Sequence, residues 1–293
     1  MRPYGGCEPA NRSDSRSMAL QDYSVVRTRD GTQTLHSLRY GEAMHSVSGA
    51  YQESLLKHVN ASGILSKTKE SLHVLDIGFG IGFNTLALIV GFMEKKSPSH
   101  LSVISLESLF DFLPLLDLIA FGDERDRSFE LIKKTMREGS YTSPRLSITL
   151  LCGDARETIR SIRDIAFDAV FHDPFSPAKN PELWSVEFFS EVRRLVDPQG
   201  VITTYSSAPQ IRSAFLEAGF LIGRGPSVGP KREGTLASVC GDISFLSSEE
   251  LASLRENHRA VPYRDPLLCD SREHILERRL AEIRARKGPP VPR

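Results

Sequence analysis

A lone carboxylate followed by a stiff loop is the feature of the sequence best suited to chemistry. Asp173 comes directly after residues 168–172, which we expect to form a short buried strand. The loop 174–181 contains three prolines, each of which fixes its own φ and restricts the residue before it. In open α/β sheets, ligands bind just beyond the carboxyl ends of the strands. We therefore expect Asp173, together with Lys179 and Asn180 of the loop, to face a ligand.

A glycine-rich turn after the predicted strand 72–76 indicates a cofactor site. Three glycines alternate in this turn, which follows Asp76: Gly78, Gly80 and Gly82. A dinucleotide-binding fingerprint would need its third glycine at position 83, where Phe83 stands. The spacing is instead typical of enzymes that use S-adenosylmethionine, which has no pyrophosphate to bind. A plain turn between a strand and a helix is the alternative.

Two further acidic residues lie at predicted strand ends. Glu107 ends the strand 101–106, at a distance from the glycines that suits a carboxylate accepting hydrogen bonds from both ribose hydroxyls. Asp154 follows the strand 146–152, where a carboxylate can accept a hydrogen bond from the amino group of adenine. The alternative for Asp154 is an N-cap of the helix expected at 157–162, and one residue can serve both purposes.

The segment before the glycine turn contains a candidate lid. Residues 22–40 are expected to form a pair of strands around the turn Asp30-Gly31, and a helix is expected from about Ala50. Between the hairpin and this helix, His45 and Ser46 precede Glu53 of the helix. These three side chains either cover a ligand or belong to a solvated loop and a packing helix, and the sequence leaves both possibilities open.

The remaining elements must bring these side chains to one edge of a sheet. Alternating strands and helices predict a doubly wound, mostly parallel sheet. A turn at 197–200 leads into one of the later strands, which are expected at 201–205, 220–222 and 236–240. Further helices are expected at 181–189, 211–218 and 272–287. Residues 110–142 are expected to form two helices that cap the site.

Basic residues occur in two late segments. Lys231 and Arg232 lie in the long loop between the last two predicted strands and are candidate contacts for the phosphates of RNA. The polar segment from residue 247 ends in the helix 272–287, which carries many arginines. We interpret the charges of this helix as a solvated face, with an RNA-contacting arm as the alternative.

The composition is that of an ordinary globular protein. The 293 residues suffice for one large domain, and 37 Lys and Arg balance 37 Asp and Glu, so a polyanionic partner would need a local basic patch. The four cysteines are too scattered for a zinc site, and we expect buried, reduced thiols. No apolar run approaches the roughly 20 residues that cross a bilayer, and no signal peptide is evident. We predict a cytoplasmic monomer with a disordered segment 1–18, a main domain 19–246 and a C-terminal extension 247–293.

Five motifs resemble those of one known family. They are GFGIGFN, SLES, GDARE, DPFSPAKNPELW and GPKRE, and the resemblance covers residues 30–241. In this order they are similar to the methyltransferase domain of MnmC, the tRNA 5-methylaminomethyl-2-thiouridine biosynthesis family. The fourth motif is the most specific. The resemblance implies a class I methyltransferase fold of seven strands, S-adenosylmethionine as methyl donor, and N-methylation of the 5-aminomethyl group of the wobble uridine in the anticodon of tRNA.

The resemblance also implies roles for individual residues. Asp173 matches the active-site aspartate of the family, while Glu107 and Asp154 match the residues that contact the ribose and the adenine. The residues that we predict to contact the cofactor are Asp76, Gly78, Phe79, Gly80, Gly82, Asn84, Glu107, Gly153, Asp154, Ala155 and Asp173. Those that we predict to contact the substrate or tRNA are His45, Ser46, Glu53, Phe175, Lys179, Asn180, Lys231 and Arg232.

The sequence departs from the familiar family pattern at two positions and at its end. Pro174 replaces a glycine, and His172 replaces an aliphatic residue. Residues 241–293 follow the last predicted strand, where bifunctional members continue into a flavin-dependent oxidase domain. We therefore expect the substrate to arrive already as aminomethyluridine. A small-molecule amine methyltransferase or aminopropyltransferase on the same fold is the alternative enzyme, and an RNA-binding protein without catalysis is the alternative of another class.

Overall fold

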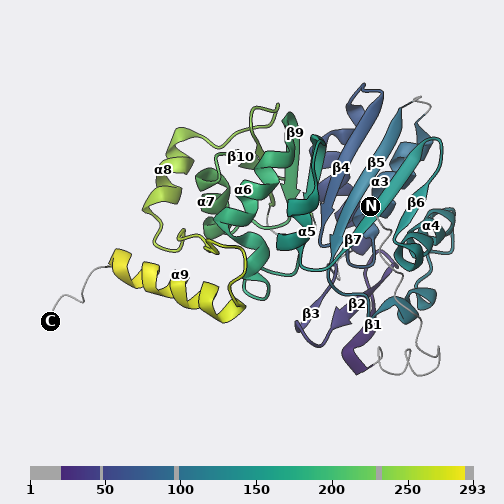
Figure 1. Ribbon diagram of the computed structural model, residues 1–293, viewed down its shortest axis with the longest axis horizontal. Helices are drawn as coiled ribbons and strands as arrows, with labels where there is room; N and C mark the ends of the chain where they lie inside the picture. Colours follow the sequence, from purple (N-terminus) through teal and green to yellow (C-terminus); the bar gives the residue numbers. More distant parts are fainter. Residues whose placement is uncertain (1–20, 47–48, 96–98, 229–232, 288–293) are drawn as a thin grey trace.

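The computed structural model describes residues 21–46, 49–95, 99–228 and 233–287 (Figure 1). The segment 1–18, predicted to be disordered, lies outside the described residues. The same holds for Lys231 and Arg232, the candidate phosphate contacts of the last long loop.

An eight-stranded sheet forms the centre of the described chain, in the order β10-β11-β9-β8-β4-β5-β7-β6. Its strands are β4 (Ser71–Ile77), β5 (His100–Glu107), β6 (Ser140–Thr142), β7 (Leu146–Cys152), β8 (Phe167–His172), β9 (Val196–Thr204), β10 (Leu221–Arg224) and β11 (Thr235–Ser238). The five strands β9, β8, β4, β5 and β7 are parallel, and the outer strands pair antiparallel: β6 at one side of the sheet, β11 and then β10 at the other. The predicted mostly parallel sheet is confirmed. It has one strand more than expected, because the chain after residue 139 pairs briefly with β7 as β6.

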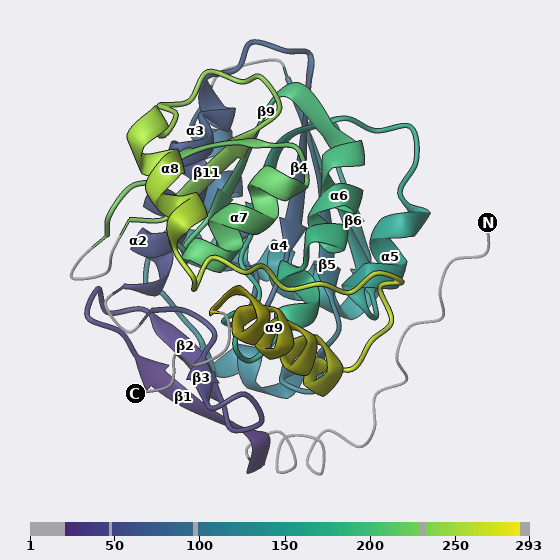
Figure 2. The same cartoon turned by 90° about the vertical axis from the view of Figure 1, so that its left-hand side faces the viewer.

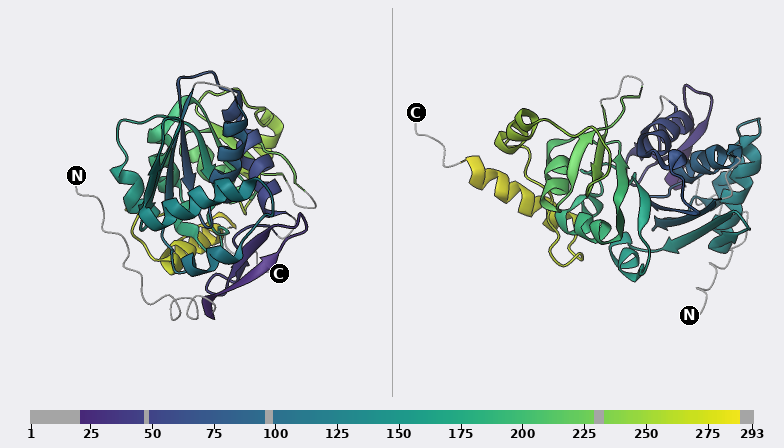
Figure 3. Two further views of the ribbon diagram at one scale, coloured as in Figure 1. Left: turned by 90° about the vertical axis from the view of Figure 1, so that its right-hand side faces the viewer. Right: turned by 90° about the horizontal axis from the view of Figure 1, so that it is seen from above.

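Helices cover both faces of the sheet, because successive residues of a strand point to opposite sides. In β4, Val74 belongs to one apolar cluster and Leu75 to the other. The helices around these clusters are α3 (Phe83–Glu94), α4 (Arg125–Glu138), α5 (Ala155–Ser161), α6 (Val186–Leu195) and α7 (Pro209–Glu217). Figure 2 looks onto the face with α6 and α7, and the left-hand view of Figure 3 looks from the opposite side onto α3 and α4. All six residues of β8 are buried, as is typical of a parallel strand covered on both faces.

A small antiparallel sheet precedes the large one. Its strands are β1 (Tyr23–Arg27), β2 (Gln33–Ser37) and β3 (Glu42–Ala43). The pairing of β1 with β2 confirms the predicted hairpin, and β3 adds a third strand to it. The helix predicted from Ala50 is α2 (Ala50–Ser54), which continues without a break as the π-helix η1 (Leu55–Asn60) and is followed by the 3-10 helix η2 (Ile64–Ser66).

The prediction that residues 110–142 form two helices is confirmed in part, but the prediction that they cap the site is wrong. The segment forms a 3-10 helix, η3 (Leu113–Leu118), then α4 and β6. Its apolar side chains, such as Phe129 and Ile132 of α4, are buried in the same cluster as those of α3. Because this apolar stripe packs onto the sheet, it does not face the strand ends where ligands bind.

Two local predictions near the carboxyl half also need correction. The helix expected over 181–189 is interrupted: η4 (Pro181–Trp184) is a 3-10 helix, and α6 begins after Ser185, whose side chain accepts a hydrogen bond from the Phe188 N–H and caps it. The turn expected at 197–200 lies inside β9. There the pairing with β8 shifts from Val196 to Val201, so residues 197–200 bulge out of the ladder.

The C-terminal extension is more regular than expected. It forms α8 (Ser248–Glu256) as well as α9 (Arg272–Lys287), and α8 begins with a capping box between Ser247 and Glu250. The prediction of buried thiols is wrong for the described cysteines, since Cys152, Cys240 and Cys269 are exposed. Within the described ranges, no helix is long and apolar enough to span a membrane.

Candidate active site

A cavity of about 630 Å³ opens at the carboxyl ends of four parallel strands. Gly78 follows β4, Glu107 ends β5, Gly153 follows β7 and Asp173 follows β8, and all four residues line the cavity. The small N-terminal sheet and the loop after β8 supply further walls. A doubly wound sheet binds its ligands at this position.

The turn between β4 and α3 brings the backbone to the cavity wall. Gly78 has a φ of +81°, and a Cβ at this position would lie 2.7 Å from the Cα of Pro174, so a side chain has no room here. Gly82 also has a positive φ, but a Cβ there would meet Ile132 of α4 at 2.5 Å. Gly78 therefore lets the loops after β4 and β8 come together, whereas Gly82 serves the packing of α4.

The Glu107 carboxylate is held by backbone donors from two turns. Its Oε2 accepts a hydrogen bond from the Gly80 N–H at 2.7 Å, and its Oε1 accepts from the N–H groups of Ser108 and Leu109 at 2.8 and 2.9 Å. Burial raises the pKa of Glu107, and these three backbone donors oppose the rise without cancelling it. The carboxylate is therefore fixed in orientation at the cavity, which Glu107 lines.

Asp173 contacts a buried histidine and an asparagine. Its Oδ2 accepts a hydrogen bond from the Asn84 side chain at 3.0 Å, and the Nε2 of His58 lies 3.6 Å from the same oxygen. The other ring nitrogen of His58, Nδ1, is 2.8 Å from the hydroxyl of Thr203. His58 is 1% exposed, so its ring is enclosed between β9 and the cavity wall. Asp173, His58 and Thr203 therefore form a line that leads from the cavity into the core.

These neighbours keep Asp173 ionised. Burial alone would raise its pKa, but the charges on His58 and His45 and the hydrogen bonds from His58 and Asn84 outweigh burial. The pKa of Asp173 therefore lies below its ordinary value. A negative charge is present at the cavity wall at neutral pH, where it can attract a cationic group of a ligand.

The N-terminal sheet holds the loop after β8 in place. The ring of Tyr40 stacks on that of Phe175, with centroids 4.0 Å apart and planes at 12°. The carboxylate of Glu42 accepts hydrogen bonds from the N–H and the hydroxyl of Ser176. All four residues line the cavity, so one wall is built jointly by the hairpin and the loop.

The main sheet and η4 hold the same loop from the other side. The hydroxyl of Tyr205, just after β9, donates to the carbonyl of Pro174 at 3.0 Å. The indole N–H of the buried Trp184 donates to the carbonyl of Phe175 at 2.9 Å. The proline-rich loop is therefore fixed by side chains from three separate elements as well as by its own prolines.

The candidate lid residues lie together at the cavity. His45, Ser46 and Glu53 all line it. The Ser46 N–H donates to Glu53 at 3.1 Å, and Glu53 forms an ion pair with the buried Lys57 at 3.1 Å. His45 contacts the Thr34 hydroxyl at 3.1 Å.

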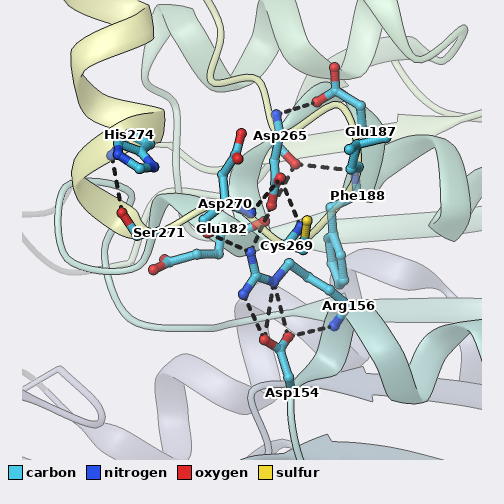
Figure 4. A network of polar contacts seen from close by, with 12 residues as sticks. Asp154, Arg156, Glu182, Glu187, Phe188, Asp265, Cys269, Asp270, Ser271 and His274 are labelled. Carbon is cyan, nitrogen blue, oxygen red and sulfur yellow. Dashed lines mark hydrogen bonds and ion pairs between the residues drawn. The ribbon is translucent and has the colours of Figure 1, made fainter.

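Asp154, another acidic residue of the cavity, is paired with an arginine. It is the N-cap of α5, where its Oδ1 accepts from the Arg156 N–H at 2.9 Å. The guanidinium of Arg156 binds the same carboxylate, with its Nη2 at 2.7 Å from Oδ2 (Figure 4). Burial raises the pKa of Asp154, but the hydrogen bonds and the charge of Arg156 bring it below its ordinary value.

Comparison with known proteins agrees with this geometry. A family model described as S-adenosyl-L-methionine-dependent methyltransferase matches residues 122–239. The crystal structure of MnmC2 from Aquifex aeolicus superposes with a TM-score of 0.82 at 31% identity, covering 94% of this chain and 93% of that one. The chain belongs to the MnmC methyltransferase family. It is an S-adenosylmethionine-dependent methyltransferase related to MnmC.

Two other relatives show how far the similarity extends. The uncharacterized protein MJ0670 of Methanocaldococcus jannaschii is 32% identical over 95% of this chain and 78% of its own length. The tRNA 5-methylaminomethyl-2-thiouridine biosynthesis bifunctional protein MnmC of Pseudomonas paraeruginosa is 33% identical over 56% of this chain, but the match covers only 26% of that protein. The chain therefore matches about a quarter of the length of this bifunctional relative.

The cavity fits the cofactor of the MnmC family. A turn whose Gly78 has no space for a Cβ lets backbone approach a ligand closely. Beside it, the Glu107 carboxylate is fixed by three backbone donors and can accept further hydrogen bonds from hydroxyl groups. Asp154 borders the same cavity from the end of β7. Gly78, Glu107 and Asp154 would hold S-adenosylmethionine, which carries a methyl group on a positively charged sulfur.

The structure brings most of the predicted site residues to this cavity. Those that line it are His45, Ser46, Glu53, Gly78, Gly80, Glu107, Gly153, Asp154, Ala155, Asp173, Phe175 and Asn180. The predicted contacts that do not line the cavity are Asp76, Phe79, Gly82, Asn84 and Lys179. Of these, Asn84 still reaches the site through Asp173, and Asp76 is buried beneath it with Thr85 as hydrogen-bond partner. The individual roles stay predictions.

Several residues of the site were not predicted from the sequence. They are Tyr40, Glu42, His58, Arg156 and Tyr205. His58 lies in η1, whose apolar periodicity indicates only a packing helix, and its partner Thr203 is 145 residues away. Arg156 could have been noticed, because an arginine two residues after an N-cap aspartate can fold back on it. Nothing local distinguishes the other three from ordinary surface or strand residues.

Proposed function

We propose that this methyltransferase N-methylates the 5-aminomethyl group of the wobble uridine in tRNA, giving 5-methylaminomethyl(-2-thio)uridine. The bifunctional MnmC relatives are named for the biosynthesis of 5-methylaminomethyl-2-thiouridine in tRNA, which supports tRNA as the partner. The observation that carries the proposal is the ionised Asp173, which borders the same cavity as the glycine turn. We further propose that the protein acts as a monomer in the cytoplasm, with a main domain at 19–246 and an extension at 247–293.

The chemistry asked of the protein is positioning and proton transfer. A methyl group on a sulfonium is displaced in line by a nitrogen lone pair, and correct alignment of the reacting atoms alone lowers the barrier by several kcal/mol. A free alkylamine has a pKa of about 10, so it arrives as an ammonium ion. Asp173 attracts this ion and holds it at the cavity wall.

The same charge opposes the loss of the proton that attack requires, because an anion nearby raises the pKa of an amine. We therefore assign Asp173 to orientation of the amine and to proton acceptance. The bound ammonium ion first loses one proton to water, because desolvation at the cavity wall favours the neutral amine. Asp173 then accepts the second proton as the N–C bond forms and the S–C bond breaks. Asn84 and His58 fix the rotamer of Asp173 through its Oδ2. Both act on Asp173 and are positioning residues.

The aromatic wall suits a nucleobase. A uridine must leave its stack for its 5-substituent to reach a cavity, and extruded bases are held by stacking on aromatic side chains. Tyr40 and Phe175 offer such a surface within the same cavity as Asp173. Lys179, beside the hairpin at Gly41, is the described candidate for a phosphate contact.

The test is nucleoside mass spectrometry of tRNA carrying 5-aminomethyluridine, incubated with the protein and isotopically labelled S-adenosylmethionine. We expect label in 5-methylaminomethyluridine. Asp173→Asn is expected to slow single-turnover methyl transfer by about 100-fold or more with tRNA affinity unchanged, since general base and positioning effects are of this size. Asp197→Asn, at the opposite end of the sheet, is the matched control and should retain full activity. Methylation of free polyamines without any label in tRNA would contradict the proposal.

His58→Gln separates positioning from folding. Because the His58 charge lowers the Asp173 pKa, the variant is expected to shift the acid limb of the pH–rate profile to higher pH. A purely structural role would lower the rate equally at every pH.

A further inference from the structure

The segment between α8 and α9 runs across the molecule to the cofactor side of the cavity. We call residues 257–271 the C-terminal strap. Figure 2 shows the strap leaving α8, crossing toward α5 and turning back into α9. It pairs with the main domain through a bridge between Tyr263 and Ser185 and a hydrogen bond from the Val186 N–H to the Tyr263 carbonyl at 3.1 Å. The strap is thus attached at the start of α6, next to the loop after β8.

Asp265 is the centre of the strap. Its side chain is fully buried, and a buried carboxylate is stable only when its oxygens have partners. Oδ1 accepts from the N–H groups of Cys269 and Asp270, both at 3.0 Å, and the Asp265 N–H donates to Glu187 of α6 at 2.7 Å. These bonds define the turn of the strap, and they leave Oδ2 free to contact another element.

Arg156 connects this carboxylate to the cavity. Its Nη1 donates to Asp265 Oδ2 at 2.7 Å and to the carbonyl of Asp270 at 2.9 Å, while its Nε and Nη2 donate to Asp154 (Figure 4). A guanidinium is planar and rigid, so fixing one edge fixes the other. The two carboxylates also differ in exposure, since the side chain of Asp265 is 0% exposed and that of Asp154 is 39% exposed. The bridge is therefore fixed at Asp265 in the strap, and its other end, Asp154, is accessible from the cavity.

We infer that the C-terminal strap positions Asp154 for the cofactor through the bridge Asp265–Arg156–Asp154. This inference rests on the proposed contact between Asp154 and the adenine. It gives the extension after residue 246 a defined part in cofactor binding, in addition to the largely exposed face of α9. Asp265 and Arg156 are positioning residues here, and the chemistry at Asp173 does not involve them.

A second contact joins the same extension to the opposite wall. Arg272, the first residue of α9, donates through Nη2 to the carbonyl of Ala178 at 3.2 Å. Ala178 belongs to the proline-rich loop that carries Phe175 and Asn180. The extension therefore contacts both the cofactor side of the cavity and the loop that faces the substrate.

Asp265→Asn tests the inference, because the amide replaces one carboxylate oxygen by N–H₂. If Oδ2 is replaced, the N–H₂ faces the guanidinium of Arg156; if Oδ1 is replaced, the N–H groups of Cys269 and Asp270 lose their acceptor. We expect the dissociation constant of S-adenosylhomocysteine, measured by calorimetry, to rise about 10-fold or more, as the loss of a charge-assisted hydrogen bond predicts. The turnover number at saturating S-adenosylmethionine is expected to stay within about 2-fold of wild type, because Asp173 and its neighbours are untouched.

Glu282→Gln is the matched control. Glu282 of α9 pairs with Arg264 of the strap at 3.0 Å, but it does not contact Arg156. The variant weakens the attachment of the extension without changing the bridge, so its affinity for S-adenosylhomocysteine should equal that of wild type. Equal losses in both variants, or unchanged affinity in Asp265→Asn, would overturn the inference.

Hydrogen exchange of the unmodified protein gives a test that does not depend on the folding of a variant. The N–H groups of Cys269 and Asp270 are bonded to Asp265, and neither residue lines the cavity. Saturation with S-adenosylhomocysteine is expected to slow their exchange together with that of the first turn of α5. No change at residues 269–270 would overturn the inference. If wild type binds the probe but does not methylate tRNA, the proposed function fails and the bridge is still tested.

Discussion

Replacing His172 by leucine is expected to remove a pH-dependent loss of stability. His172 is fully buried at the end of β8, where its ring lies edge-on to Trp184, with centroids 4.5 Å apart, and 5.0 Å from Phe189. Among the residues that the structure describes, neither ring nitrogen has a hydrogen-bond partner of standard geometry. Burial lowers the pKa of His172 from 6.5 to about 3; the charge of Asp173 opposes this shift and that of His58 adds to it.

The sign and size of the effect follow from proton binding. Below pH 6.5 the unfolded chain protonates this histidine, whereas the folded chain keeps it neutral down to about pH 3. Stability therefore falls as the pH falls through this window. At pH 5 the unfolded state lies about 1.5 units below its pKa, and at about 1.4 kcal/mol per unit the loss relative to pH 8 is about 2 kcal/mol.

The assay is urea unfolding followed by circular dichroism at pH 8 and pH 5. The free energy of unfolding of wild type is expected to fall by about 2 kcal/mol more than that of His172→Leu between the two pH values. Other titrating groups are present in both proteins and cancel in this difference. His258→Leu, which removes an exposed histidine, is the control and should follow wild type. Equal pH dependence in wild type and His172→Leu would refute the reasoning.

Three further changes probe the cavity and the buried residue beneath it. Burial raises the pKa of Asp76 to about 7, so the folded state keeps a proton that the unfolded state loses above about pH 4. The stability of wild type should therefore fall as the pH rises from 4 to 7. The urea midpoint of Asp76→Asn should lack this fall. Gly78→Ala, which puts a Cβ 2.7 Å from Pro174, is expected to destabilise the fold by about 1–3 kcal/mol in a thermal melt, and an unchanged melting temperature would argue against the close approach. Glu107→Gln replaces one carboxylate oxygen by an amide N–H₂, so either the Gly80 N–H or the N–H groups of Ser108 and Leu109 lose their acceptor. Calorimetry should then find S-adenosylhomocysteine binding about 10-fold weaker or more, with tRNA affinity as in wild type.

The strand ends were predictable because their signals are local. Asp173 and Gly78 each follow a short apolar strand, and the carboxyl ends of parallel strands meet at one edge of a sheet. Pairing over long distances left no such signal. His58 meets Thr203 across 145 residues, and Arg156 meets Asp265 across 109, so neither contact could be read from periodicity.

Other differences between prediction and structure arise where two local sequence signals favour different helix boundaries. The pattern Ser247-x-x-Glu250 is a capping box, but the polar composition after it favoured an irregular segment over α8. Pro181 is suited to begin a helix, yet Ser185 caps a new one four residues later. In both places the capping side chain decides where the helix begins, and composition alone does not.

The hydrogen bond from Trp184 to the Phe175 carbonyl allows intrinsic tryptophan fluorescence to report on ligand binding. Trp184 is the one tryptophan among the 293 residues, so all tryptophan fluorescence comes from a side chain that is hydrogen-bonded to the proline-rich loop. A ligand that pulls Phe175 toward the cavity would alter the polarity around that single fluorophore. Stopped-flow fluorescence can therefore time the arrival of each ligand without attaching a dye.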